Sequence, residues 1–122
     1  MAVRTFAAID VGSFELELGI YEMTYKTGIR RIDHIRHVIA LGKDTYSTGK
    51  ISYELVEEMC QVLEEFVQIM KSYKVKDYRA YATSAMREAH NRQIILDQIR
   101  VRTGLPCVLS VIQSSGSSVI RP

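Results

Sequence analysis

Residues 8–20 read AIDVGSFELELGI, an apolar strand that stops at the stretch DVGS (residues 10–13) and then resumes. Two interpretations of this interruption are open. A buried strand can end in a turn that serves the fold alone, or a carboxylate beside exposed backbone N–H groups can serve a phosphate and its metal. Short motifs match by chance, so the choice depends on the rest of the chain.

Length and charge limit the possible partners. The chain has 122 residues, enough for one domain with a real core but too few for two full lobes around a deep cleft. Its formal net charge is only +2, and charges of both signs are spread along it. We therefore expect no nucleic-acid partner, and any bound anion has to be held by a local site.

Cysteine placement and the N-terminal sequence indicate the compartment. Cys60 and Cys107 lie inside apolar runs without a partner at metal-ligand spacing. The first ten residues contain no cleavable hydrophobic segment, and no apolar run approaches the length needed to cross a bilayer. We expect a reduced, cytoplasmic protein that does not enter a membrane.

Hydrophobic periodicity predicts five strands. A short apolar run comes first, and a run that alternates with period two follows. The third run has polar and apolar residues on both of its sides, which is typical of an edge strand. Two further short runs come later in the chain. The predicted strands are 4–10, 15–23, 29–41, 77–82 and 107–112.

Two helices are predicted between the later strands. Ser52 can cap the first helix, with Ile51 and Val56 as its hydrophobic staple. Its apolar residues recur at steps of three and four and are Leu55, Met59, Val62, Leu63, Phe66, Met70 and Tyr73. A second helical stretch opens at Thr83 or Ser84 and ends near residue 103, where a glycine can form a left-handed cap.

The segment 42–50 is rich in Gly, Asp, Thr and Ser and is predicted to be a loop. The resulting order, βββαβαβ, predicts an α/β domain with a mixed five-stranded sheet and helices on its faces, the layout of a ribonuclease-H-like domain. Residues 1–112 are assigned to this domain. The serine-rich tail 113–122 has no carboxylate and is expected to be disordered.

A second polar stretch, ATSAMREAHN at residues 82–91, follows the fourth predicted strand. Together with DVGS, with LG at 41–42 and with TGKIS at 48–52, it resembles the N-terminal part of the exopolyphosphatase/guanosine pentaphosphate phosphohydrolase (Ppx/GppA) family, which belongs to the actin-like ATPase superfamily. The resemblance covers residues 6 to about 112. The DVGS loop alone is a weak signal, whereas the ATSAMREAHN run is a specific one.

The resemblance implies a phosphate site and a divalent metal, Mg²⁺. It implies that Asp10 lies near the metal and that the Gly12 and Ser13 backbone, with the Ser13 hydroxyl, cradles a phosphate. Thr83 and Arg87 then close on the phosphates from another side. These residue types suit the role, because glycine permits close approach of an anion and arginine adds bidentate contacts. The catalytic residues are not assigned.

Plainer interpretations remain open for each residue taken alone. Thr83 or Ser84 can be an ordinary helix cap, and Arg87 can be a solvated partner of Glu88 or Asp97. The two motifs taken jointly favour the phosphate site.

The chain departs from the family at two places. Where the family usually continues Gly-Ser-Asn-Ser, this chain has Phe14 and Glu15, which remove one amide donor and add a carboxylate that repels phosphate. After the fifth strand the family brings in a catalytic glutamate, a second glycine-rich loop and a second lobe, none of which is found in residues 113–122. We therefore expect this chain by itself to lack catalysis.

The leading hypothesis is an N-terminal part of a phosphohydrolase that acts on inorganic polyphosphate or guanosine pentaphosphate. The alternative is a phosphate- or nucleotide-binding module without catalysis. A kinase or chaperone-type ATPase fragment is disfavoured by ATSAMREAHN. Surface that later segments cover in the family is expected to be exposed here, which predicts a homodimer.

Overall fold

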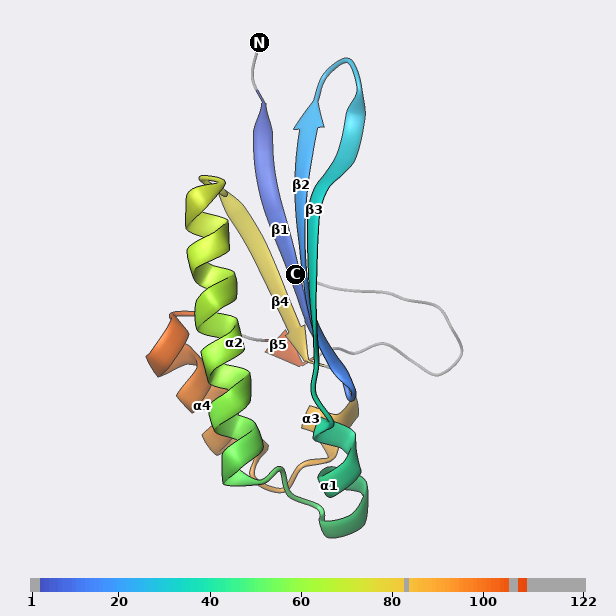
Figure 1. Ribbon diagram of the computed structural model, residues 1–122, viewed down its shortest axis with the longest axis vertical. Helices are drawn as coiled ribbons and strands as arrows, with labels where there is room; N and C mark the ends of the chain where they lie inside the picture. Colours follow the sequence, from blue (N-terminus) through green and yellow to red (C-terminus); the bar gives the residue numbers. More distant parts are fainter. Residues whose placement is uncertain (1–2, 83, 106–107, 110–122) are drawn as a thin grey trace.

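The structure is a computed structural model that describes residues 3–82, 84–105 and 108–109, with the side chains of Asp44, Ser84, Val108 and Leu109 excepted. Figure 1 shows a twisted sheet, a long helix along it and a pair of short helices at one end. The elements in chain order are β1 (Arg4–Val11), β2 (Glu15–Thr24), β3 (Gly28–Val38), α1 (Leu41–Thr48), α2 (Tyr53–Ser72), β4 (Asp77–Ala82), α3 (Ser84–Glu88), α4 (Arg92–Thr103) and β5 (Val108–Leu109).

The strands form one mixed sheet in the order β3-β2-β1-β4-β5. β2 pairs antiparallel with β1 and with β3, whereas β4 runs parallel to β1 and to β5. The predicted mixed α/β architecture is therefore confirmed, and β3 lies at an edge as its mixed sides predict. Of the predicted fifth strand, only Val108–Leu109 falls within the described residues. The predicted tail 113–122 lies outside them.

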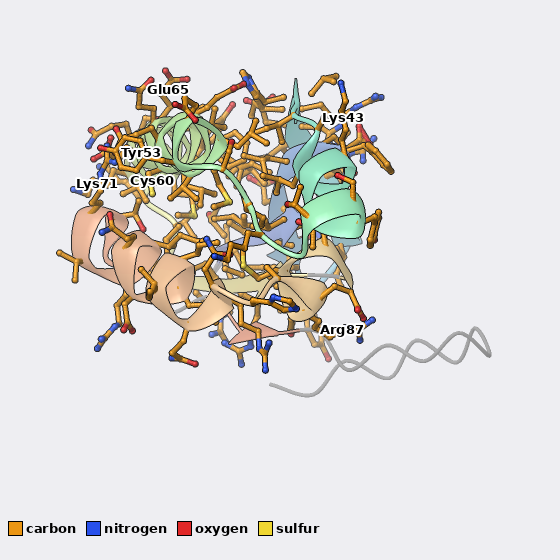
Figure 2. All side chains as sticks on the ribbon, turned by 90° about the horizontal axis from the view of Figure 1, so that it is seen from below. Lys43, Tyr53, Cys60, Glu65, Lys71 and Arg87 are labelled. Carbon is orange, nitrogen blue, oxygen red and sulfur yellow. The ribbon has the colours of Figure 1, made fainter. Side chains whose placement is uncertain are left out.

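The core lies between one face of the sheet and the helices α2 and α4, which cover that face together (Figures 1 and 2). The strand β1 alternates, so Ile9 and Val11 are buried on this face while Asp10 lies on the opposite face, which no described helix covers. The stripe that α2 buries closely matches its predicted periodicity and comprises Val56, Met59, Cys60, Val62, Leu63, Phe66 and Met70. Ser52 caps α2 as predicted and accepts a hydrogen bond from the Leu55 N–H at 3.3 Å.

The prediction of a loop over 42–50 was wrong, because these residues form the helix α1 (Leu41–Thr48). Leu41 and Thr45 are both almost fully buried, so tertiary packing outweighs the turn-prone composition. The Thr45 hydroxyl donates to the Leu41 carbonyl oxygen at 2.9 Å, which satisfies the buried side chain inside the helix. Gly49 ends α1 in the left-handed conformation and donates its N–H to the Thr45 carbonyl oxygen.

The second predicted helix is two helices, α3 and α4, with a break at residues 89–91. The Asn91 side chain does not cap α4 but hydrogen bonds to the backbone of Ile51, before α2. This use of the side chain explains why the chain turns at this point. The far end of the helical stretch is as predicted, since Gly104 forms a left-handed cap with its N–H on the Arg100 carbonyl oxygen. No helix in the described part of the chain is long and apolar enough to span a membrane.

Candidate phosphate-binding site

The two sequence motifs meet at one edge of the sheet. β1 and β4 are parallel neighbours, and their last residues, Val11 and Ala82, are partners in the register. The DVGS turn follows the first of these strands and α3 follows the second, so both stretches leave the sheet side by side. Thr83, between Ala82 and α3, lies outside the described residues.

Gly12 forms the tight turn between β1 and β2. Its N–H donates to the Glu15 carbonyl oxygen at 2.9 Å, and a Cβ added to Gly12 would lie 3.0 Å from that oxygen. The turn therefore favours glycine for reasons of space. The Gly12 N–H is used inside the hairpin and is not available to an anion. Gly12 can therefore contribute to anion binding only through its small size, which allows an anion to approach the backbone closely.

The helix α1 and the residues just before it support the next two residues of the turn. The Gly42 N–H donates to the Ser13 carbonyl oxygen at 2.8 Å, and the Ile39 N–H donates to the Phe14 carbonyl oxygen at 3.0 Å. The Ser13 hydroxyl lies 3.2 Å from the Tyr46 hydroxyl. The turn is thus held from one side by a helix that the sequence did not predict.

Asp10 lies on the face of the sheet opposite α2 and α4, where its register partners are Glu17 on β2 and Tyr81 on β4. Loss of hydration is the main cause that raises the pKa of the Asp10 carboxyl, and the charges of Glu17 and Glu15 raise it further. A cation at this position would relieve that repulsion.

The neighbouring carboxylates are already paired. Glu15 forms an ion pair with Arg36 at 2.8 Å, and Glu17 lies 2.7 Å from the His34 ring nitrogen. Within the described residues there is no cluster of three His, Cys, Asp or Glu side chains that could hold a metal. Asp10 alone nevertheless fits Mg²⁺, which commonly takes one or two protein carboxylates and completes its shell with water and substrate phosphate.

Arg87 projects from α3 at the outer surface of the molecule, on the side away from Lys43 of α1 (Figure 2). The helices α1 and α3 pack against each other, so Arg87 belongs to the same end of the molecule as the turn at Ser13. Asp97, one of the carboxylates considered as its partner, lies 3.4 Å from Arg100.

Two features of this end were not found from the sequence. The His90 N–H donates to the Gly49 carbonyl oxygen at 2.7 Å, and the Asn91 side chain binds Ile51, so the last residues of ATSAMREAHN join the α1–α2 connection to α3. The contact between Tyr46 and Ser13 was also missed. No local sequence signal predicts it, because it depends on α1 being a helix.

Comparison with known proteins identifies the relatives of this arrangement. The sequence model of the Ppx/GppA phosphatase family matches residues 20–115. The chain belongs to this family. Among curated relatives, exopolyphosphatase 1 of Mycobacterium tuberculosis is 28% identical over 97 residues, which cover 80% of this chain and 28% of the relative.

Solved structures of Ppx/GppA proteins have the same fold. A crystal structure of the Aquifex aeolicus family member superposes with a TM-score of 0.85 at 28% identity, covering 88% of this chain and 35% of that one. An exopolyphosphatase from Cytophaga hutchinsonii, at 22% identity, matches in fold with a TM-score of 0.82 over 88% of this chain and 34% of its own. The present chain therefore spans about a third or less of the length of these relatives.

Proposed function

We propose that this chain is the phosphate-binding N-terminal part of a phosphohydrolase that acts on inorganic polyphosphate or guanosine pentaphosphate. Membership of the Ppx/GppA family and relatives named exopolyphosphatase support the substrate class. The observation that carries the site is the pairing of Val11 with Ala82, which brings the DVGS turn and α3 to one edge. In this proposal the sheet is the ribonuclease-H-like sheet of an actin-like ATPase fold, whose ligands bind where its central parallel strands end.

The proposed site holds phosphate by hydrogen bonds and charge. The Ser13 hydroxyl donates from the turn, Gly12 allows the phosphate to come close, and the guanidinium of Arg87 binds it from α3. Thr83 contributes a second hydroxyl. Asp10 holds Mg²⁺, which when bound neutralises part of the phosphate charge.

The departure at Phe14 and Glu15 does not remove this site. The Glu15 carboxylate is paired with Arg36 at 2.8 Å, so much of its repulsion toward a phosphate is balanced locally. The Phe14 side chain is 58% exposed and does not fill the turn.

Binding without hydrolysis is the activity we propose for this chain by itself. Cleavage of a phosphoanhydride needs a base that orients water in line with the leaving group, together with donors on the phosphoryl oxygens. The carboxylate that follows the turn, Glu15, is paired with Arg36 at 2.8 Å. We propose that the base comes from the part of the relatives that this chain does not span. If the chain acts alone, it is a binding module for phosphate or nucleotide.

Calorimetric titration with tripolyphosphate in the presence of Mg²⁺ tests the proposal. Ser13→Ala and Arg87→Ala should each weaken the binding of tripolyphosphate. For Arg87→Ala we expect a loss of about tenfold or more, because a hydrogen bond between charged groups contributes about 1.5–3 kcal/mol. Arg100→Ala is the matched control, since Arg100 is an exposed arginine on α4. Equal affinity of all four proteins would show that the phosphate site is assigned wrongly.

A further inference from the structure

Three large apolar residues stand exposed around the turn that carries Ser13. They are Phe14, Val38 and Tyr46, and their exposed fractions are 58%, 74% and 56%. Apolar side chains of this size gain most when they leave water, so an exposed group of them beside a polar site is typical of a surface that binds a ligand or a partner. We call Phe14, Val38 and Tyr46 the turn patch.

Backbone contacts hold two members of the turn patch at the same end of the sheet. The Phe14 carbonyl oxygen accepts the Ile39 N–H at 3.0 Å, and Val38, the residue before Ile39, is the register partner of Glu15. The end of β3 therefore lies against the tip of the turn between β1 and β2, where Phe14 stands.

Tyr46 reaches the same turn from α1. A Cβ added to Gly42 would lie 2.9 Å from the Tyr46 ring and 3.2 Å from the Ser13 Cβ, and the Tyr46 hydroxyl lies 3.2 Å from Ser13 Oγ. The turn patch is therefore built from three segments of the chain, and it adjoins the serine that we propose as a phosphate ligand.

We propose that the turn patch binds the base of a nucleotide whose phosphates occupy the site at Ser13, and that the base stacks on the Phe14 ring. This inference rests on the proposed function. In a nucleotide only the ribose separates the base from the first phosphate, and Phe14 directly follows Ser13, at a Cα–Cα distance of about 3.8 Å. The base and the first phosphate can therefore occupy neighbouring positions on the turn, while the outer phosphates extend toward α3.

The polar groups next to the turn patch favour a base over a partner protein. Glu15 follows Phe14 and forms an ion pair with Arg36 at 2.8 Å, and both side chains are partly exposed. A protein surface seated on the patch would take this ion pair out of water, which costs free energy. A flat base covers little more than the ring on which it stacks, and it leaves the ion pair hydrated. The consequence is that this chain prefers nucleotides to inorganic polyphosphate.

Calorimetric titrations with GTP and with tripolyphosphate, each with Mg²⁺, compare two triphosphates that differ by the nucleoside. We expect the unaltered chain to bind GTP more tightly than tripolyphosphate. Phe14→Ala should weaken GTP binding about fivefold or more and should weaken tripolyphosphate binding much less, because only GTP loses a stacking partner. Phe14→Tyr keeps a ring at this position and should retain the preference for GTP.

Tyr25→Ala is the matched control for the loss of an exposed ring. Tyr25 is 99% exposed and lies in the turn between β2 and β3, at the opposite end of the sheet (Figure 1). This variant should bind GTP as the unaltered chain does. A urea midpoint measured for each variant shows that the fold is retained.

Four other results are possible, and each overturns the inference. If GTP and tripolyphosphate bind equally while Ser13→Ala and Arg87→Ala weaken both, the phosphate site stands without a site for the base. If Phe14→Ala weakens both ligands equally, Phe14 only supports the shape of the turn. If Phe14→Ala leaves GTP binding unchanged and reduces self-association in sedimentation, the turn patch is a contact between protein chains. If neither ligand binds, or neither Ser13→Ala nor Arg87→Ala weakens binding, the proposed function itself is wrong.

Discussion

Asn91 and Ile51 are joined by two hydrogen bonds although 40 residues separate them in the chain. The Asn91 side-chain oxygen accepts the Ile51 N–H at 3.3 Å, and its side-chain nitrogen donates to the Ile51 carbonyl oxygen at 3.1 Å. The Ile51 side chain is buried, so few waters could replace these partners. One amide therefore satisfies the backbone between α1 and α2 and fixes the start of α4.

Asn91→Ala should lower the free energy of unfolding by about 1–3 kcal/mol, because it leaves two backbone groups of Ile51 without their partner. Urea denaturation measures the loss. Gln93→Ala, at an exposed position of α4, is the control and should change stability by no more than about 0.5 kcal/mol. Equal stability of both variants would show that water replaces the Asn91 side chain at no cost.

The hydrogen bond between Tyr73 and Asp33 predicts that the stability of the fold depends on pH. The Tyr73 hydroxyl donates to the Asp33 carboxylate at 2.6 Å, and this bond, followed by the bond from the His34 N–H, lowers the pKa of Asp33. Because the pKa is lower in the folded chain, the stabilisation is complete above the ordinary carboxyl pKa of about 4 and is lost as the pH falls through the folded value.

Tyr73→Phe should therefore reduce stability at neutral pH, and its difference from the unaltered chain should shrink as the pH is lowered below about 4. The pKa of Asp33, followed by carboxyl carbon NMR, should rise in the same variant. Tyr25→Phe is the control, since the Tyr25 side chain is 99% exposed. An unchanged Asp33 pKa in Tyr73→Phe would contradict the assigned cause.

Gly49 and Gly104 end their helices in the same left-handed conformation, with φ of 80° and 78°, but only Gly49 is crowded. A Cβ at Gly49 would lie 2.8 Å from the His90 ring, whereas nothing lies within 4 Å of one at Gly104. Gly104→Ala should lower the free energy of unfolding by about 1–2 kcal/mol, because alanine is disfavoured in the left-handed conformation. Gly49→Ala should lower the free energy of unfolding by more than this, because its Cβ also meets the His90 ring. Adding His90→Ala should remove that additional loss, and urea denaturation measures both. Equal costs for the two single variants would mean that the His90 ring moves aside freely.

The chain by itself should not release phosphate from polyphosphate or guanosine pentaphosphate above the buffer rate, even with Mg²⁺. A missing base typically costs about 10²–10⁴-fold in rate, and a site open to water loses positioning as well. A continuous phosphate-release assay measures this, with exopolyphosphatase 1 of M. tuberculosis as the positive control. Release that Arg87→Ala abolishes would show that a carboxylate of this chain, such as Glu88, serves as the base.

The sequence predicted the strands β1 and β2 and the helix α2 well because their apolar residues follow simple periods. Leu16, Leu18 and Ile20 alternate with polar neighbours on β2, and the stripe of α2 repeats every three or four residues. The helix α1 was missed because its eight residues include glycine, threonine and serine, whereas the burial of Leu41 and Thr45 in the folded chain helps to stabilise it.

The residues of the candidate site were indicated by the family resemblance and not by periodicity. The family resemblance indicated Asp10, Gly12, Ser13, Thr83 and Arg87, and the parallel pairing of β1 with β4 brings the two motifs together. The hydrogen bond of Gly12 inside the turn and the contact of Tyr46 with Ser13 could not be predicted, because both depend on the path of the chain after β1 and β3. The expected homodimer stays a prediction, which sedimentation at several concentrations would test.

The most direct test of the central claim is an NMR titration of ¹⁵N-labelled chain with tripolyphosphate and Mg²⁺. If phosphate binds where β1 and β4 end, the amides of Ser13, Gly42 and the residues of α3 should shift in a saturable manner. The same titration of Arg87→Ala should require a higher tripolyphosphate concentration to reach the same shifts. Absence of saturable shifts at these positions, or saturable shifts confined to the arginines of β3, would contradict the account.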